Sequence, residues 1–235
     1  MKYKTLLKKL NLKEEDFSTM KNAIEQAENK TDGEIAVAIA PESGSYSFWE
    51  LLAANILAAV ILFVLFPFSS KISSLYDYLF WHHAPTWIVP ACLIISCFAA
   101  IILGFYLTNI PAIDRIIIPK QVKKIQVTNR AFRYFTESGI YKTENHCGIL
   151  IFISYLERQV RIVADEGISS KISQDMWNLI ADELAEDIKK GKTTTAITNA
   201  VNKCGELLEE FYPLSKPKSD VLTNEVVILE GAECD

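Results

Sequence analysis

The chain has 235 residues, a net charge of −5 and a sequence pI near 5.4. Nucleic-acid-binding proteins usually present a basic face, so this acidic chain is not expected to bind nucleic acid. The five cysteines follow no CxxC or Cys/His spacing, which excludes a zinc motif and indicates reduced thiols rather than a disulfide framework.

The first 47 residues predict one helix and one strand. Apolar residues recur at steps of three and four between Phe17 and Ala27, a pattern typical of an amphipathic helix that ends near Lys30. A turn at residues 31–33 leads into small and branched apolar residues at 34–40, which indicate a strand.

Residues 48–107 predict a membrane hairpin. Its two apolar runs, 51–68 and 87–107, contain no Asp, Glu, Lys or Arg, and each is long enough to cross a hydrocarbon core of roughly 30 Å. Tryptophans lie at or near the ends of the runs, where their rings favour the headgroup level. The alternative is a buried hairpin in a soluble protein. We favour the membrane because core helices are usually amphipathic and these runs are apolar on all sides.

Positive charges predict the orientation of this hairpin. The connection at 69–86 carries only Lys71, whereas several basic residues flank the hairpin outside it: Lys30, Arg115, Lys120, Lys123 and Lys124. The positive-inside tendency then places both termini in the cytoplasm. We expect a multi-pass membrane protein without a cleaved signal peptide. The basic stretch 115–133 would also attract anionic headgroups, although the topology signal alone explains it.

The chain after the hairpin predicts the rest of a compact domain. A helix should follow Pro119 and run to about residue 136. Residues 148–154 are the most apolar run outside the hairpin and predict a central strand, with 159–165 as its hairpin partner. Two further helices, at about 172–188 and 193–211, complete the folded part.

This order predicts an α/β fold, in which a small mixed sheet has helices on both faces and is interrupted by a transmembrane helical hairpin. The helix after Pro119 is a suitable crossover, so the first two strands should be parallel and the third antiparallel. We expect three parts: one discontinuous cytoplasmic domain at 1–47 plus 108–213, the hairpin at 48–107, and a flexible acidic tail at 214–235. The apolar patch 226–229 could pair with a partner's sheet edge, but we favour a loose terminus with a chance apolar run.

Four blocks of the soluble part resemble the TPM domain family. They are TDGEI at 31–35, CGILIFIS at 147–154, ERQV at 157–160 and IVADEGI at 162–168. Their order and spacing are similar to a bacterial branch in which two membrane spans interrupt the domain after its first strand. The resemblance extends from about Phe17 to Pro213 and does not include the tail.

The resemblance implies a three-layer domain with helices on both sides of a small sheet. Members of the family have been credited with phosphatase activity and with binding divalent cations, and others look like accessory factors for membrane complexes. The family therefore implies the fold more firmly than the chemistry.

Acidic residues gather at one predicted end of the sheet. Asp32 and Glu34 enter the first strand, Glu144 precedes the second, and Asp165 and Glu166 leave the third. Crowded carboxylates repel one another unless a cation lies between them, and oxygen ligands suit Ca²⁺ or Mg²⁺. These five residues are our candidate metal ligands, and the alternative is that they are solvated turn residues.

The opposite end of the sheet holds a second group of polar residues: Glu42, Ser43, Ser154, Glu157 and Arg158. Ligands of open α/β sheets usually bind at the carboxyl ends of the strands. We rank this group second, because a bilayer at that end would limit access to it.

The sequence assigns no catalytic residue. It has no Cys-x5-Arg loop, Asp-x-Asp motif, Gly-x-Ser-x-Gly elbow or phosphate-cradling glycine loop. His82 and His83 fall in the outer connection and fit interfacial residues better than metal ligands, and His146 alone is too little for acid–base catalysis. Whether the chain is an enzyme stays open.

Two functions fit these observations. We favour a membrane-anchored TPM-like domain protein, a non-catalytic accessory or regulatory factor at the cytoplasmic face of a membrane. Its expected partners are the lipid bilayer and another membrane protein or complex, and its candidate cofactor is Ca²⁺ or Mg²⁺. The alternative is a metal-dependent phosphatase that attacks phosphomonoesters with a metal-activated water. Transport is disfavoured, because two uncharged spans enclose no polar path.

Overall fold

The computed structural model describes residues 3–81, 83–108, 110–143, 146–215 and 224–231. The chain divides into two compact units, which are described separately below. Unit 1 comprises residues 1–44 and 120–235, and unit 2 comprises residues 45–119. Unit 2 therefore interrupts the sequence of unit 1 directly after its first strand.

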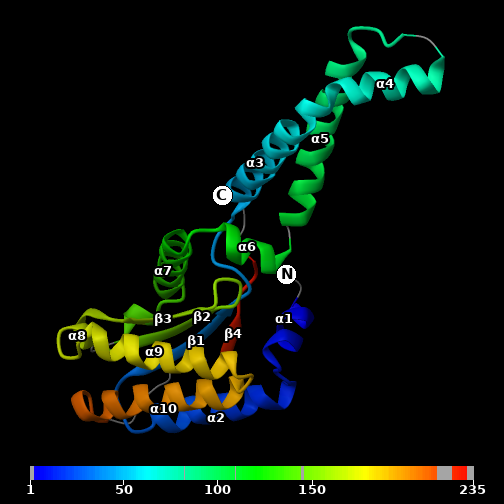
Figure 1. Cartoon of the computed structure of the whole chain (residues 1–235). Coiled ribbons are helices and arrows are strands. Elements are labelled where there is room, and N and C mark those ends of the chain that lie inside the picture. Colours follow the sequence, from blue (N-terminus) through cyan, green and yellow to red (C-terminus); the bar gives the residue numbers. More distant parts are fainter. Residues whose placement is uncertain (1–2, 82, 109, 144–145, 216–223, 232–235) are drawn as a thin grey trace. The chain divides into compact units, whose positions relative to one another are not determined.

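Unit 1 is built on a four-stranded sheet with the order β3-β2-β1-β4 (Figure 1). β1 (Glu34–Ala40) and β2 (Gly148–Ser154) are parallel, and β3 (Gln159–Ala164) runs antiparallel to β2. The register aligns the first and last residues of β1 with those of β2. The predicted strands and their relative directions are confirmed.

Alternation along β1 gives the sheet two apolar faces. Ile35, Val37 and Ile39 belong to one buried cluster, whereas Ala36 and Ala38 belong to a second cluster on the other face. Every residue of β2 is buried, as expected for a central strand that is covered on both sides.

Three long helices cover the first face: α2 (Glu14–Glu28), α9 (Gln174–Lys189) and α10 (Thr193–Phe211) (Figure 1). Their apolar stripes supply the large buried side chains of this layer: Met20, Ile24, Trp177, Leu184, Ile197 and Val201. A shorter helix, α1 (Tyr3–Leu10), was not predicted, and it adds Leu6 and Leu10 to the same cluster.

The second face of the sheet is covered by α7 (Lys120–Glu137), which begins directly after Pro119 as predicted. Its side chains Val127, Ala131 and Phe135 recur at steps of four and are buried against the sheet. The predicted arrangement, a mixed sheet with helices on both faces, is confirmed.

One part of the tail, residues 226–228, differs from the prediction of a flexible segment. There, β4 (Val226–Ile228) pairs in parallel with residues 37–39 of β1 and covers that edge of the sheet. Val226 is 8% exposed and joins the cluster on the first face, and the N–H of Leu229 donates to Ile39 O at 2.9 Å. The apolar patch therefore pairs with the sheet of its own chain, because β1 offers an edge that can still form hydrogen bonds.

Unit 2 is helical throughout its described secondary structure. Its elements are α3 (Ser47–Leu65), η1 (Phe66–Phe68), α4 (Ser69–Phe80), α5 (Ile88–Thr108) and α6 (Pro111–Ile117). The expected connection at 69–86 is thus largely a helix. Within it, Asp77 lies 3.8 Å from His83 Nδ1 and accepts the N–H of Ala84 at 2.6 Å, while His82 lies outside the described residues.

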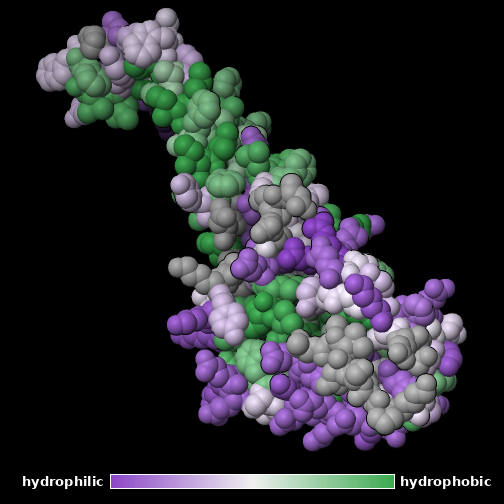
Figure 2. Space-filling model, turned by 180° about the vertical axis from the view of Figure 1, so that it is seen from behind, coloured by the Kyte–Doolittle hydropathy of each residue, from purple (hydrophilic) through white to green (hydrophobic). Residues whose placement is uncertain are grey.

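Two helical stretches of unit 2, Ser47–Phe80 and Ile88–Leu107, are long and apolar enough to cross a membrane. Most of their side chains are exposed, and Figure 2 shows the resulting apolar surface along α3 and α5. The two helices meet through small residues: a Cβ added to Gly104 would lie 3.1 Å from Ala54 Cα, and Ala54, Ala58 and Ala100 are buried. Small residues at a helix pair are typical of membrane interfaces, where backbones approach closely.

Candidate functional site

The acidic residues lie at one edge of the sheet, where β1 and β2 begin and β3 ends. Glu34 is paired with Gly148, and the N–H of Asp165 donates to Gly148 O at 2.9 Å. Paired positions on neighbouring strands face the same side, here the side covered by α7. Glu34 and Asp165 thus flank a glycine, with backbones separated by twice the strand spacing of about 4.8 Å.

Gly148 has no room for a side chain. An added Cβ would lie 2.3 Å from the carbonyl oxygen of Ile140, in the short helix η2 (Ile140–Lys142). The backbone of η2 therefore fills the space over this glycine, between the positions of Glu34 and Asp165. The glycine is required here by close backbone approach rather than by a positive φ.

Asp165 caps a helix. Its Oδ1 accepts the N–H of Glu166 at 2.8 Å at the start of α8 (Glu166–Ser169), and its Oδ2 lies 3.5 Å from His146 Nδ1. The Asp165 side chain is 11% exposed, whereas that of His146 is 68% exposed and reaches the carboxylate from the solvent side. At this pair, two groups that were considered from the sequence meet in the described structure.

The other candidate ligands are arranged differently. Asp32 accepts the N–H of Ser215 at 2.9 Å and its hydroxyl at 2.6 Å, and so holds the chain that leaves α10. Glu34 is 1% exposed, Glu166 is exposed, and Glu144 lies outside the described residues. Among the residues that the structure describes, no three His, Cys, Asp or Glu side chains form a group that could hold a metal ion.

The second predicted group forms a buried network at the carboxyl ends of β1 and β2. The Ser154 hydroxyl donates to Glu157 Oε2 at 2.5 Å and lies 2.6 Å from the Ser43 hydroxyl. Glu157 Oε1 accepts the N–H of Ser43 at 2.8 Å. All three residues are at most 6% exposed, so this network ties the end of β1 to the turn between β2 and β3.

Glu42 adds a second carboxylate to this end of the sheet. Burial raises its pKa above 4.5, and repulsion from Glu157 adds to the increase. The tail contributes to the burial, because a Cβ added to Gly231 would lie 2.8 Å from Glu42 Oε1. The chain after β4 therefore passes directly over this carboxyl group.

A pocket of about 590 Å³, here called the basic pocket, opens beside this network. It lies between α1, the turn after β2, and the segment that joins α9 to α10. Its charged lining residues are Lys9, Arg158, Lys189 and Glu186. Sequence reasoning identified Arg158 but missed both lysines, because nothing in the sequence of α1 places it against the turn after β2.

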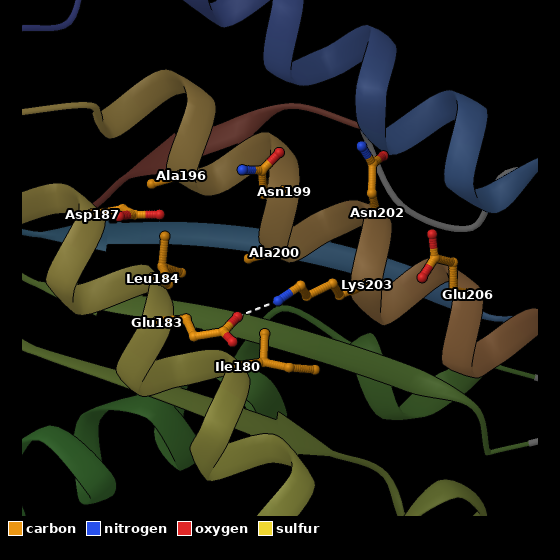
Figure 3. A pocket seen from close by; sticks show the side chains of 10 residues that line it. All are labelled: Ile180, Glu183, Leu184, Asp187, Ala196, Asn199, Ala200, Asn202, Lys203 and Glu206. Carbon is orange, nitrogen blue, oxygen red and sulfur yellow. Dashed lines mark hydrogen bonds and ion pairs between the residues drawn. The ribbon is translucent and has the colours of Figure 1, made fainter.

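A shallower groove of about 320 Å³ lies between α9 and α10 (Figure 3). Figure 3 shows Lys203 of α10 reaching across to Glu183 of α9, with which it forms an ion pair. Asp187 bonds instead to Lys190 Nζ at 2.8 Å, and this contact lowers the Asp187 pKa. The described residues that line the groove include no His, Cys, Ser or Thr.

The comparisons with known proteins extend this description. The model of the TPM domain matches residues 115–207, which include α7, β2, β3, α9 and most of α10. A comparison with curated proteins finds no match. The BA42 protein of the psychrophilic bacterium Bizionia argentinensis, whose structure was solved by NMR, is similar in fold, with a TM-score of 0.52 and 16% identity over 92% of this chain and 94% of that chain.

These findings confirm part of the resemblance seen in the sequence. Three of the four blocks, from residue 147 to residue 168, lie inside the match, whereas the block at 31–35 precedes it. The branch with two membrane spans stays a prediction. Residues 115–207 match the TPM domain, and the chain as a whole is similar in fold to the BA42 protein.

Proposed function

We propose that this chain is anchored in a membrane through unit 2 and acts there as a non-catalytic accessory or regulatory factor. The observation that carries the proposal is the apolar surface of α3 and α5: Phe63 is 82% exposed and Phe98 is 63% exposed. Burying apolar surface contributes about 25 cal/mol per Å², so side chains of this kind favour the hydrocarbon of a bilayer over water. Membrane fractions should retain the full chain after alkaline washing and release it to detergent. Recovery in the wash would contradict the anchor.

The orientation proposed from the charges places both ends of the chain in the cytoplasm of a bacterium, beneath the inner membrane. Single cysteines at Lys71 and Lys124, in a chain whose own cysteines are replaced by alanine, test it. In intact spheroplasts a membrane-impermeant maleimide should label K71C and leave K124C unlabelled until the cells are lysed. Labelling of K124C in intact spheroplasts would reverse the orientation.

The accessory role is supported by the match of residues 115–207 to the TPM domain, and no three His, Cys, Asp or Glu side chains among the described residues form a group that could hold a catalytic metal ion. A factor of this kind should have a defined membrane partner. Purification of the tagged chain from native membranes in mild detergent should recover one protein in fixed ratio to it. A chain that elutes alone as a monomer under these conditions would contradict the role.

Divalent cation binding belongs to the same proposal. The described donors fit a cation only in part, because Asp32 is engaged by Ser215 and Glu34 is buried. Glu166 is exposed at that edge, and the neighbouring Asp165 side chain is 11% exposed. Calcium or magnesium titration of the full chain in detergent, followed by NMR, should shift the amide signals of these two residues. The D165N variant should lose the shifts, and equal shifts in both proteins would contradict the assignment.

The second candidate function is a metal-dependent phosphatase, and the observation that favours it is the TPM domain match, since the matching model is named for a phosphatase. The activity would depend on a cation at the acidic edge, where the metal would supply an activated water. The full chain with Mg²⁺ should then hydrolyse a phosphomonoester and lose that activity in D165N but not in E210Q. A rate no higher than that of buffer would exclude it.

A further inference from the structure

The basic pocket differs from the acidic edge in the sign of its charge. Its described lining contains three basic side chains, Lys9, Arg158 and Lys189, and one acidic side chain, Glu186. Lys189 Nζ lies 3.3 Å from Glu186 Oε1, so these two charges neutralise each other. Lys9 and Arg158 remain, and no described carboxylate pairs with either of them.

The nearby carboxylate that could pair with Arg158 is engaged elsewhere. Glu157 precedes Arg158 in the chain, but its oxygens accept bonds from Ser43 and Ser154 at 2.8 Å and 2.5 Å. The buried network thus turns the acidic side chain away from the pocket and leaves the guanidinium exposed beside it.

The backbone of Arg158 is strained. Its φ is +52°, in the left-handed region that glycine and asparagine occupy more readily. An arginine adopts this conformation at an energetic cost, and such positions occur both in tight turns between antiparallel strands and at functional sites.

The remaining lining residues suit a phosphate ester. Lys9 Nζ lies 5.7 Å from the ring centroid of Tyr155, which positions the ammonium group at the pocket wall, and the Gln159 amide lines the same pocket. A guanidinium binds phosphate oxygens through two parallel N–H bonds, and an ammonium adds a point charge. The described lining residues include no His or Cys, and the hydroxyls of Ser154 and Thr193 donate to Glu157 Oε2 and to Leu10 O.

We propose that the basic pocket is a binding site for a phosphate group, carried by a small soluble ester or by a lipid headgroup, and that Arg158 and Lys9 hold it. This inference goes beyond the anchoring role and does not depend on the acidic edge. A chain that is washed from the membrane could still bind phosphate, and an anchored chain could fail to bind it.

The test uses the full chain in neutral detergent with inorganic phosphate, followed by the amide signals of Tyr155, Arg158 and Gln159. Saturable shifts are expected, with affinity about tenfold lower in Lys9→Gln and in Arg158→Gly. The glycine variant separates binding from folding, because it relieves the strain and should not lower the Tm. Lys190→Gln is the matched control, since Lys190 pairs with Asp187 and does not line the pocket.

A second arm identifies the source of the phosphate. The same chain in nanodiscs of phosphatidylcholine, with and without phosphatidic acid, reports whether a headgroup produces the same shifts. Shifts with inorganic phosphate assign a soluble ester, and shifts with phosphatidic acid alone assign a headgroup. The proposal is overturned if neither probe shifts these signals, or if Arg158→Gly binds as tightly as the natural chain.

Discussion

Ser154 and Glu157 are joined by a hydrogen bond of 2.5 Å from the serine hydroxyl to Oε2, although both residues are nearly inaccessible to water. The other carboxylate oxygen accepts the N–H of Ser43, which follows β1. One side chain therefore fastens the end of β1 and the turn after β2 to each other, at the point where the chain departs toward unit 2.

Replacing Glu157 by alanine should weaken unit 1 considerably. The change leaves the Ser43 N–H buried without its acceptor, and the Ser154 hydroxyl keeps only the bond to the Ser43 hydroxyl. A buried unpaired group costs about 1–3 kcal/mol. Hydrogen exchange of the β1 and β2 amides in the detergent-solubilised chain should report a loss in that range. E210A, at an exposed residue of α10, is the control and should change nothing. Equal protection in both variants would mean that water replaces the carboxylate.

Glu42 predicts how stability depends on pH. Its pKa is higher in the folded chain than its ordinary value of 4.5, so the folded state holds the proton more tightly than the unfolded state. The contribution of Glu42 to stability is therefore most favourable below pH 4.5 and is lost as the pH rises through the folded pKa, above which it is constant. E42Q should remove this part of the pH dependence and raise the Tm at pH 7. An unchanged Tm–pH curve would show that Glu42 stays solvated.

Gly148→Ala should destabilise the sheet more than Gly44→Ala does. The new Cβ would lie 2.3 Å from the carbonyl oxygen of Ile140, which is an overlap. If the Gly148 backbone moved to relieve it, the pairing of Gly148 with Glu34 on one side and Asp165 on the other would be disturbed. Overpacking of this kind costs about 1–3 kcal/mol or more. G44A is a suitable comparison, because its Cβ would meet only the flexible Gln126 side chain at 2.9 Å. Similar denaturation midpoints for both variants would contradict this account.

Much of the fold could be predicted because its signals are local. The fully apolar run 148–154, the alternation in 159–164 and the four-residue spacing in α7 each follow from burial on one or two faces. Strand directions then followed from the lengths of the connections. The prediction for residues 226–228 was wrong because the signal there is not local. A strand of three residues is too short to show a pattern in the sequence, and it forms only because the edge of β1 lies beside it.

The candidate site was less accessible to sequence reasoning. Strand ends placed Ser43 near Ser154, and Glu34 near Asp165, because topology alone fixes which residues share an edge. The direction of each side chain depends on its partners, and these were not predictable: Ser215 engages Asp32, and Ile140 fills the space over Gly148. Lys9 lines the basic pocket because α1 packs beside the turn after β2. The sequence shows no signal for this packing.

The strand β4 should protect the edge of β1. Val226→Asp would bury a charge at a position that is 8% exposed, so we expect the tail to detach while the rest of unit 1 stays folded. The amides of residues 37–39 should then exchange faster, and a protease should cleave the tail more readily. V227D is the control of equal charge at a half-buried position and should have a smaller effect. Unchanged exchange in V226D would mean that β4 contributes little to that edge.

Cys204 should be unreactive in the folded chain. Burial raises the pKa of its thiol from 9.0 to about 12, and the thiolate is the form that reacts with alkylating agents. Iodoacetamide at pH 8 should leave Cys204 unmodified until the chain is denatured, as measured by mass spectrometry of its peptide. E210C supplies an exposed thiol on the same helix and should be modified rapidly in the native state. The raised pKa also makes the stability of the folded chain depend on pH. The buried neutral thiol makes its full contribution to the free energy of unfolding below pH 9, and this contribution is lost as the pH rises toward 12. Alkaline unfolding should therefore begin earlier than in C204A. Modification of Cys204 at the rate of E210C would show that α10 opens often enough to expose this layer of the core.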